Sequence, residues 1–164
     1  MKDEIKFYKF FKPDLNPKRM LQYGVFGGSY LGDTISEYPK SWFIKAKINK
    51  TFDVNINYFQ VRAGQSLKEW KKKGWIMDED PRGWFQWYCR FYMGRRTKDD
   101  ERQIKRWLKL AGPNGRFRRR LMNQIIKVKS RYNNLEISPV IRQVLLHWGY
   151  ELTKEDLSTY KGLK

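Results

Sequence analysis

The segment DPRGWFQWYCRFYMG, residues 80–94, predicts a helix with almost no polar face. Aspartate followed by proline is a strong start signal for a helix, and Gly94 marks the expected end. The only polar line along this helix is formed by Arg82, Gln86 and Arg90. A helix that is apolar on nearly every side belongs in the interior of a fold. We therefore expect this segment to be the central helix of the protein.

Cap residues and glycine stops predict further helices on both sides of this segment. The expected starts lie at Asn16, Pro39, Ser66, Asp99, Asn114, Ser138 and Thr153. Residues 52–61 alternate apolar and polar side chains, so at most a minor strand is expected there. The predicted fold class is all-α: a compact bundle of about seven or eight short helices around an aromatic-rich core, in a single domain over residues 1–164.

Chain length and charge bound the function. A chain of 164 residues is long enough to bury about 70% of its unfolded surface in one core. Its 35 Lys and Arg residues outnumber 17 Asp and Glu residues, which gives a formal net charge of +18. Such an excess makes a polyanion the natural partner.

The positive charge is concentrated in one part of the chain. Residues 81–131 contain 16 basic and 3 acidic side chains, which is +13 of the +18, and 11 of the 14 arginines lie between Arg82 and Arg131. The planar guanidinium group suits paired hydrogen bonds to phosphate better than the lysine ammonium does. The basic region at about residues 90–131 is therefore predicted to be a binding surface.

Two predicted helices, starting at Asp99 and Asn114, carry most of these bases opposite an apolar stripe. Only the residues GPNG, 112–115, separate them, so we expect the helices to be antiparallel or steeply crossed, with merged basic faces. The candidate nucleic-acid-binding residues are Arg95, Arg96, Arg102, Lys105, Arg106, Lys109, Arg116, Arg118, Arg119, Arg120 and Lys127.

These features favour a nucleic-acid-binding protein that contacts the phosphate backbone with low sequence specificity, with duplex DNA as the expected form. Asn123 and Gln124 are the only amides on the most basic helix that could read bases. One alternative is a structural or assembly protein, such as a component of a virion or a large complex, that docks on an acidic protein partner. A third hypothesis is an enzyme that processes nucleic acid.

Few residues are candidates for catalysis. The acidic run Asp78 to Asp80 could hold a divalent metal ion, although Asp80 also suits the start of a helix. The single histidine, His147, lacks the partners that a metal site or a general-base pair needs. Cys89 lies among aromatic residues and is interpreted as a packed thiol. We assign no catalytic residue, metal ion or cofactor from the sequence.

The glycine-rich segment YGVFGGSYLGD, residues 23–33, invites comparison with phosphate-binding loops. It matches neither the Walker pattern nor a dinucleotide-binding fingerprint. A flexible loop, or close packing of backbone around its tyrosines, is the preferred interpretation.

The expected location is intracellular, cytoplasmic or nuclear, and not secreted. A single cysteine excludes an internal disulfide. The N-terminal residues contain no apolar signal-peptide core, and no stretch is long and apolar enough to predict a membrane span.

The segments DPRGWFQWYCR, RQIKRW, SPVIRQVLLHW, YGVFGGSYL and SLKEWKKKGWI resemble a family of small uncharacterised proteins of microbes and large DNA viruses. The resemblance covers about residues 18–150. It implies kinship and brings no activity, catalytic residue or cofactor, so the functional interpretation depends on the residues themselves.

Overall fold

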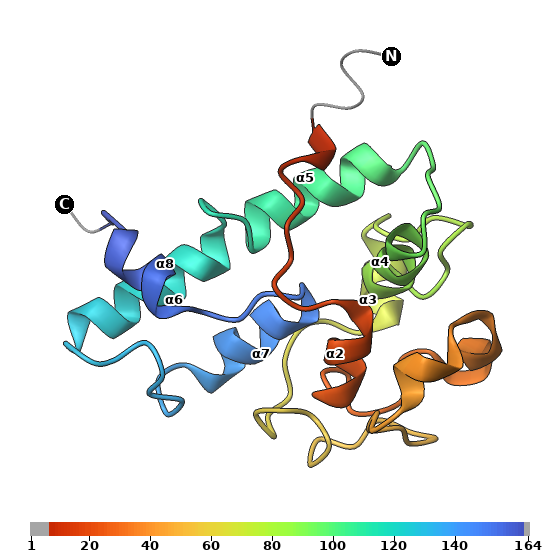
Figure 1. Cartoon of the computed structure of the whole chain (residues 1–164), viewed down its shortest axis with the longest axis horizontal. Helices are drawn as coiled ribbons and strands as arrows, with labels where there is room; N and C mark the ends of the chain where they lie inside the picture. Colours follow the sequence, from red (N-terminus) through yellow and green to blue (C-terminus); the bar gives the residue numbers. More distant parts are fainter. Residues whose placement is uncertain (1–6, 163–164) are drawn as a thin grey trace.

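The computed structural model describes residues 7–162, and within that range it contains helices and no β-strand. The all-α class predicted from the sequence is confirmed. In Figure 1, α5 and α6 form a diagonal along one side of the molecule, while the orange segment with η1 and η2 lies on the opposite side, at the lower right. The elements are α2 (Pro17–Gln22), η1 (Gly32–Glu37), η2 (Lys40–Phe43), α3 (Leu67–Lys72), α4 (Trp84–Tyr92), α5 (Asp100–Leu110), α6 (Arg116–Lys127), α7 (Pro139–His147) and α8 (Lys154–Thr159).

Helix α4 occupies the centre of the core, as predicted. Its first six residues, Trp84 to Cys89, are all buried, and Trp87 is fully inaccessible to solvent. The ring of Phe11, from the N-terminal segment, packs edge-on against Tyr88 at 5.4 Å and against Trp107 of α5 at 5.2 Å. Burial of large aromatic side chains dominates the energetics of a core of this kind.

The start of α4 differs from the prediction. The helix begins at Trp84, three residues after Pro81, and Asp80 does not cap it. The Asp80 carboxylate instead accepts hydrogen bonds from Arg90 and Arg95. Gly83 precedes the helix at φ 98, a conformation that favours glycine. The Asp80 carboxylate therefore binds two arginine side chains of the folded chain and does not cap the helix.

Three of the predicted caps are confirmed. The side chains of Asn16, Ser66 and Thr153 accept hydrogen bonds from backbone N–H groups three residues later, at 2.9, 3.2 and 3.1 Å. The expected start at Ser138 is also confirmed, with Pro139 as the first residue of α7, although the Ser138 side chain makes no cap hydrogen bond. The expected cap at Asn114 is wrong. Gly115 opens α6 without a side-chain cap, and the Ser138 hydroxyl donates to the side-chain oxygen of Gln124.

The segment between α2 and α3 is largely irregular. The helix expected from Pro39 is only the single turn η2. The alternating residues 52–61 form turns, because the Asp53 carboxylate accepts from the backbone N–H of Asn55 at 2.9 Å and reverses the chain.

One buried glutamine of α7 connects this irregular segment to the helices. Gln143 is fully buried; its amide donates to the backbone carbonyl of Val25 at 2.8 Å and accepts from the backbone N–H of Phe59 at 3.0 Å. Both loop groups are thereby satisfied inside the protein.

Candidate nucleic-acid interface

Helices α5 and α6 carry most of the predicted binding residues, but they do not form a hairpin. In Figure 1, α6 follows α5 along the same diagonal, so the expected antiparallel or steeply crossed arrangement is wrong. The residues between them make a tight turn in which the N–H of Gly115 donates to the carbonyl of Gly112 at 2.8 Å. The two helices therefore follow one another in this view, and α6 contacts both α7 and α5.

Four of the eleven predicted residues are neutralised by carboxylates of the protein itself. Arg102 pairs with Asp99 one turn away, and the exposed Lys105 pairs with Glu101. The other two pairs are long-range: Arg95 with Asp80 at 2.6 Å and Arg118 with Asp156 at 2.6 Å.

Arg118 and Arg95 have structural roles for this reason. The Arg118 guanidinium lies over the ring of Tyr150 at 4.4 Å and holds α6 to α8 through Asp156. Asp80 is only 1% exposed, so Arg95 is half of a buried ion pair that is needed to compensate the carboxylate. Neither arginine is available as a free phosphate ligand.

Two further arginines are held by aromatic rings. Arg96 lies over the ring of Phe91 at 3.8 Å and donates to the carbonyls of Phe91 and Arg95. The half-buried Arg106 lies 5.0 Å from the ring of Trp75 and 5.4 Å from that of Trp148. No carboxylate within residues 7–162 forms an ion pair with either guanidinium.

Of the five remaining residues, Lys109 lies near the end of α5 and the other four lie on α6. A shallow groove of about 370 Å³ runs along one face of this helix, where positions three, four, seven and eleven residues apart lie on the same side. Its cations are exposed, and none forms an ion pair with a described carboxylate. The groove is lined by Arg116, Arg119, Arg120, Asn123, Gln124 and Lys127.

A second concave surface begins where this groove ends. Arg116 lines both the groove and a neighbouring pocket, which Arg106 and Lys109 also line. The structure thus brings together six of the predicted cations that form no ion pair with a carboxylate of residues 7–162: Arg106, Lys109, Arg116, Arg119, Arg120 and Lys127. Trp70 and Trp75 also line this pocket, and the sequence analysis did not identify them as candidates. The signal was present in the segment WKKKGW, where tryptophans flank lysines. Proteins that bind single strands combine such aromatic and cationic contacts.

The acidic run shows no sign of a metal site. Asp80 is occupied by two arginines, whereas Asp78 and Glu79 are exposed. No group of three or more metal-ligating side chains occurs among the residues that the structure describes. Cys89 is buried, and burial raises the pKa of its thiol well above the usual value, as expected for a packed cysteine.

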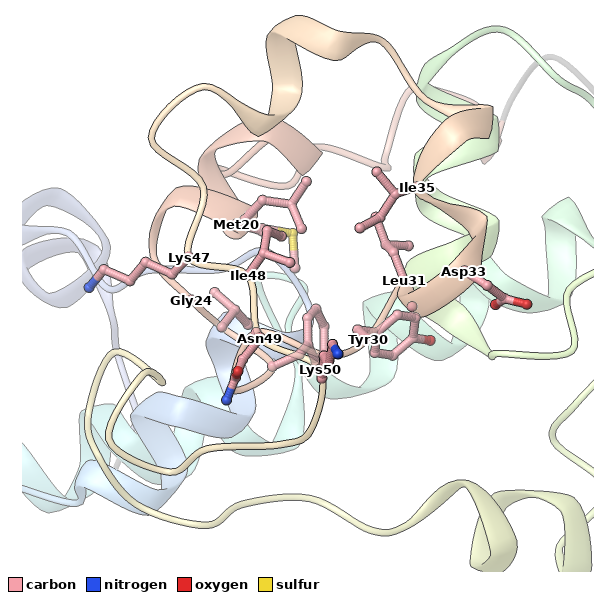
Figure 2. Close-up of a pocket in the computed structure, with 15 residues that line it drawn as sticks. Met20, Gly24, Tyr30, Leu31, Asp33, Ile35, Lys47, Ile48, Asn49 and Lys50 are labelled. Carbon is pink, nitrogen blue, oxygen red and sulfur yellow. The ribbon is translucent and has the colours of Figure 1, made fainter.

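The glycine-rich loop forms one wall of a hollow of about 510 Å³. Figure 2 shows Met20 and Ile48 facing Leu31 and Ile35 across it, while Lys47, Asn49, Lys50 and Asp33 add polar groups to the lining. Gly28 has φ 87, and a Cβ atom there would lie 2.8 Å from the backbone nitrogen of Asn49. At Gly28 the lack of a side chain therefore serves close backbone packing, which agrees with the preferred sequence interpretation.

His147 stacks on Phe26 with ring centroids 4.9 Å apart, and burial lowers the pKa of its imidazole to about 4. In the unfolded chain the imidazole has a pKa near 6.5. Between pH 6.5 and pH 4 His147 is therefore protonated in the unfolded chain but not in the folded protein. The free energy of unfolding should therefore fall as the pH drops through this window, by about 3 kcal/mol. Urea unfolding of wild type and of His147→Phe between pH 4 and pH 7 measures this; parallel curves would contradict the assignment.

No described helix has both the length and the apolar character needed to cross a membrane. Comparisons with family models, with curated proteins and with solved structures found no match, so function has to be inferred from the residues themselves.

Proposed function

We propose that this protein binds the phosphate backbone of nucleic acid, with duplex DNA as the expected form, through the groove along α6. One observation carries the proposal: Arg116, Arg119, Arg120 and Lys127 line a single groove and have no acidic partner among the described residues. Cations that served only solubility would have no reason to gather in one groove.

The dimensions of the groove suit a row of phosphates. From Arg116 to Lys127 the helix rises about 16 Å at 1.5 Å per residue. This length is several times the axial rise of one nucleotide, about 3.4 Å, so the face can contact more than one phosphate of a strand. Three of the four cations are arginines, which form paired hydrogen bonds with phosphate oxygens.

The groove offers little for reading bases. Asn123 and Gln124 are its only amides, and the side-chain oxygen of Gln124 accepts from Ser138. Specific contacts to adenine need both the donor and the acceptor of an amide. We therefore infer binding with low sequence specificity.

Salt dependence tests the proposal. With four to six phosphate contacts, affinity for duplex DNA should fall by about 10² to 10³ between 50 and 200 mM salt. The variant Arg119→Glu/Arg120→Glu should lose about 100-fold in affinity at fixed salt, because each change removes a contact and adds repulsion.

The matched control is Lys40→Glu/Lys50→Glu, which alters the net charge equally on exposed residues that line neither the α6 groove nor the neighbouring pocket. Its affinity should change by less than about threefold. Equal losses in the two variants would show that net charge alone attracts DNA and would defeat the proposal, as would an affinity that ignores salt.

A second candidate is docking on an acidic protein partner in a larger assembly. It is favoured by exposed apolar side chains near the end of α6 and the start of α7: Ile126, Val128, Leu135 and Val140. Exposed apolar side chains beside charge are common in protein interfaces. Displacement by excess unrelated DNA separates the candidates, because a shape-specific protein dock would survive it.

A further inference from the structure

The pocket next to the α6 groove is deeper and more aromatic than the groove itself. Its volume is about 640 Å³, within the range of small-molecule sites. The walls come from α3, α4 and α7 and from the loops near Phe26 and Trp75, and the cations come from α5 and α6. The residues that matter below are Trp70, Trp75, Trp84, Arg106, Arg116 and His147.

Two of the tryptophans in this pocket are not used in aromatic packing. The rings of Trp84 and Trp148 pack on each other at 4.8 Å, as do most rings of the core. Trp70 and Trp75 are only partly buried and stack on no other ring of the described chain. Such rings can stack on a planar ligand, and every nucleobase has a planar face.

One cation of this pocket, Arg106, is partly desolvated and forms no ion pair with a described carboxylate. Arg106 has no acidic partner in residues 7–162, and its one side-chain hydrogen bond, to Gln103, is long at 3.4 Å. Burial, with repulsion from Arg102, lowers the pKa of its guanidinium to about 10. A bound anion would offset this desolvation.

One residue that lines the pocket also carries a polar atom without a partner. Trp84 is 6% exposed, and its indole Nε1 is buried with no hydrogen bond to any described residue. Buried indole N–H groups normally have an acceptor. The carbonyl or ring nitrogen of a base would supply one, whereas an aliphatic ligand would not.

Arg116 lines both the pocket and the α6 groove, so a strand whose phosphates follow the groove leads into the pocket. We propose that the pocket receives one unpaired nucleotide, with its base against Trp70 and Trp75 and its phosphate near Arg106 and Arg116. This inference rests on the proposed function, and it adds that the preferred nucleic acid contains an unpaired or extruded base.

Three labelled duplexes of equal length test this inference: one fully paired, one with a single central extra nucleotide, and one with an abasic residue at that extra position. The extra nucleotide should bind about tenfold tighter than the other two, because stacking of a base on an aromatic side chain strengthens binding by about that factor. The abasic duplex controls for flexibility of the backbone without a base.

The variant Trp70→Leu/Trp75→Leu should abolish this preference and leave the affinity for the paired duplex unchanged. Tyr92→Leu, a change at a 51% exposed ring outside the pocket, should keep the preference. Equal binding of all three duplexes overturns the pocket assignment and leaves the α6 groove standing. Failure of all three to bind overturns both proposals together.

Discussion

Replacement of Asp100 by alanine is expected to lower the free energy of unfolding by about 3–5 kcal/mol, because it removes a buried carboxylate and leaves several donors without an acceptor. Asp100 is 1% exposed and begins α5. It accepts from the indole Nε1 of Trp87 at 2.9 Å, from the backbone N–H and hydroxyl of Thr97 at 3.0 and 3.1 Å, and from the hydroxyl of Tyr8 at 3.2 Å.

Urea unfolding followed by circular dichroism measures the effect. Asp100→Asn keeps one acceptor oxygen and should lose less, while Asp78→Ala, at an exposed aspartate outside any ion pair of the described chain, should change stability by less than about 0.5 kcal/mol. A loss below 1 kcal/mol for Asp100→Ala would show that the carboxylate does not join α4 to α5 as the structure indicates.

Trp107→Ala is expected to cost about 3–5 kcal/mol as well, from the cavity that it leaves in the core. Trp107 is 2% exposed, packs against Phe11, and donates from its indole nitrogen to the carbonyl of Trp148 at 2.7 Å. Thermal and urea unfolding both report this loss. Trp107→Phe separates the contributions: it keeps most of the volume and should lose about 1–3 kcal/mol for the unsatisfied carbonyl.

Trp107 also connects the core to the pocket, because it donates to the carbonyl of Trp148, whose ring lies beside Arg106. Trp75→Ala, at a half-buried ring of the pocket, should destabilise the protein much less than Trp107→Ala. Equal losses in the two variants would mean that Trp75 belongs to the core and is not available for a ligand.

Local chemistry explains which parts of the fold were predictable. Asn16, Ser66 and Thr153 act within three residues of themselves, and the inner stripe of α5, with Ile104, Trp107 and Ala111 buried, follows from helical periodicity. The cap predicted at Asp80 is wrong because folding brings Arg90 and Arg95, 10 and 15 residues later in the sequence, to its carboxylate.

The candidate site was predictable in part. Helical spacing places Arg116, Arg119, Arg120 and Lys127 on one face of α6, as the groove shows, but it does not reveal which other arginines pair with acids. Sequence spacing placed Arg118 and Arg119 together on one basic helix, yet Arg118 pairs with Asp156, 38 residues later, whereas Arg119 lines the groove. Pairing across the fold decides which arginines are free. Local patterns carry no information about such pairs, and the binding role of the free residues stays a prediction.

The absence of acidic residues from the first turn of α6 has an electrostatic consequence. The amino end of a helix carries a partial positive charge, and acidic residues normally occupy it. The first turn of α6 contains no acid and begins RFRRR, so the opening turn of this helix is opposed by its own backbone dipole. A phosphate bound in the groove would interact favourably with both the arginines and the helix dipole. We therefore expect the backbone amides of this first turn to exchange with deuterium more slowly when nucleic acid is bound.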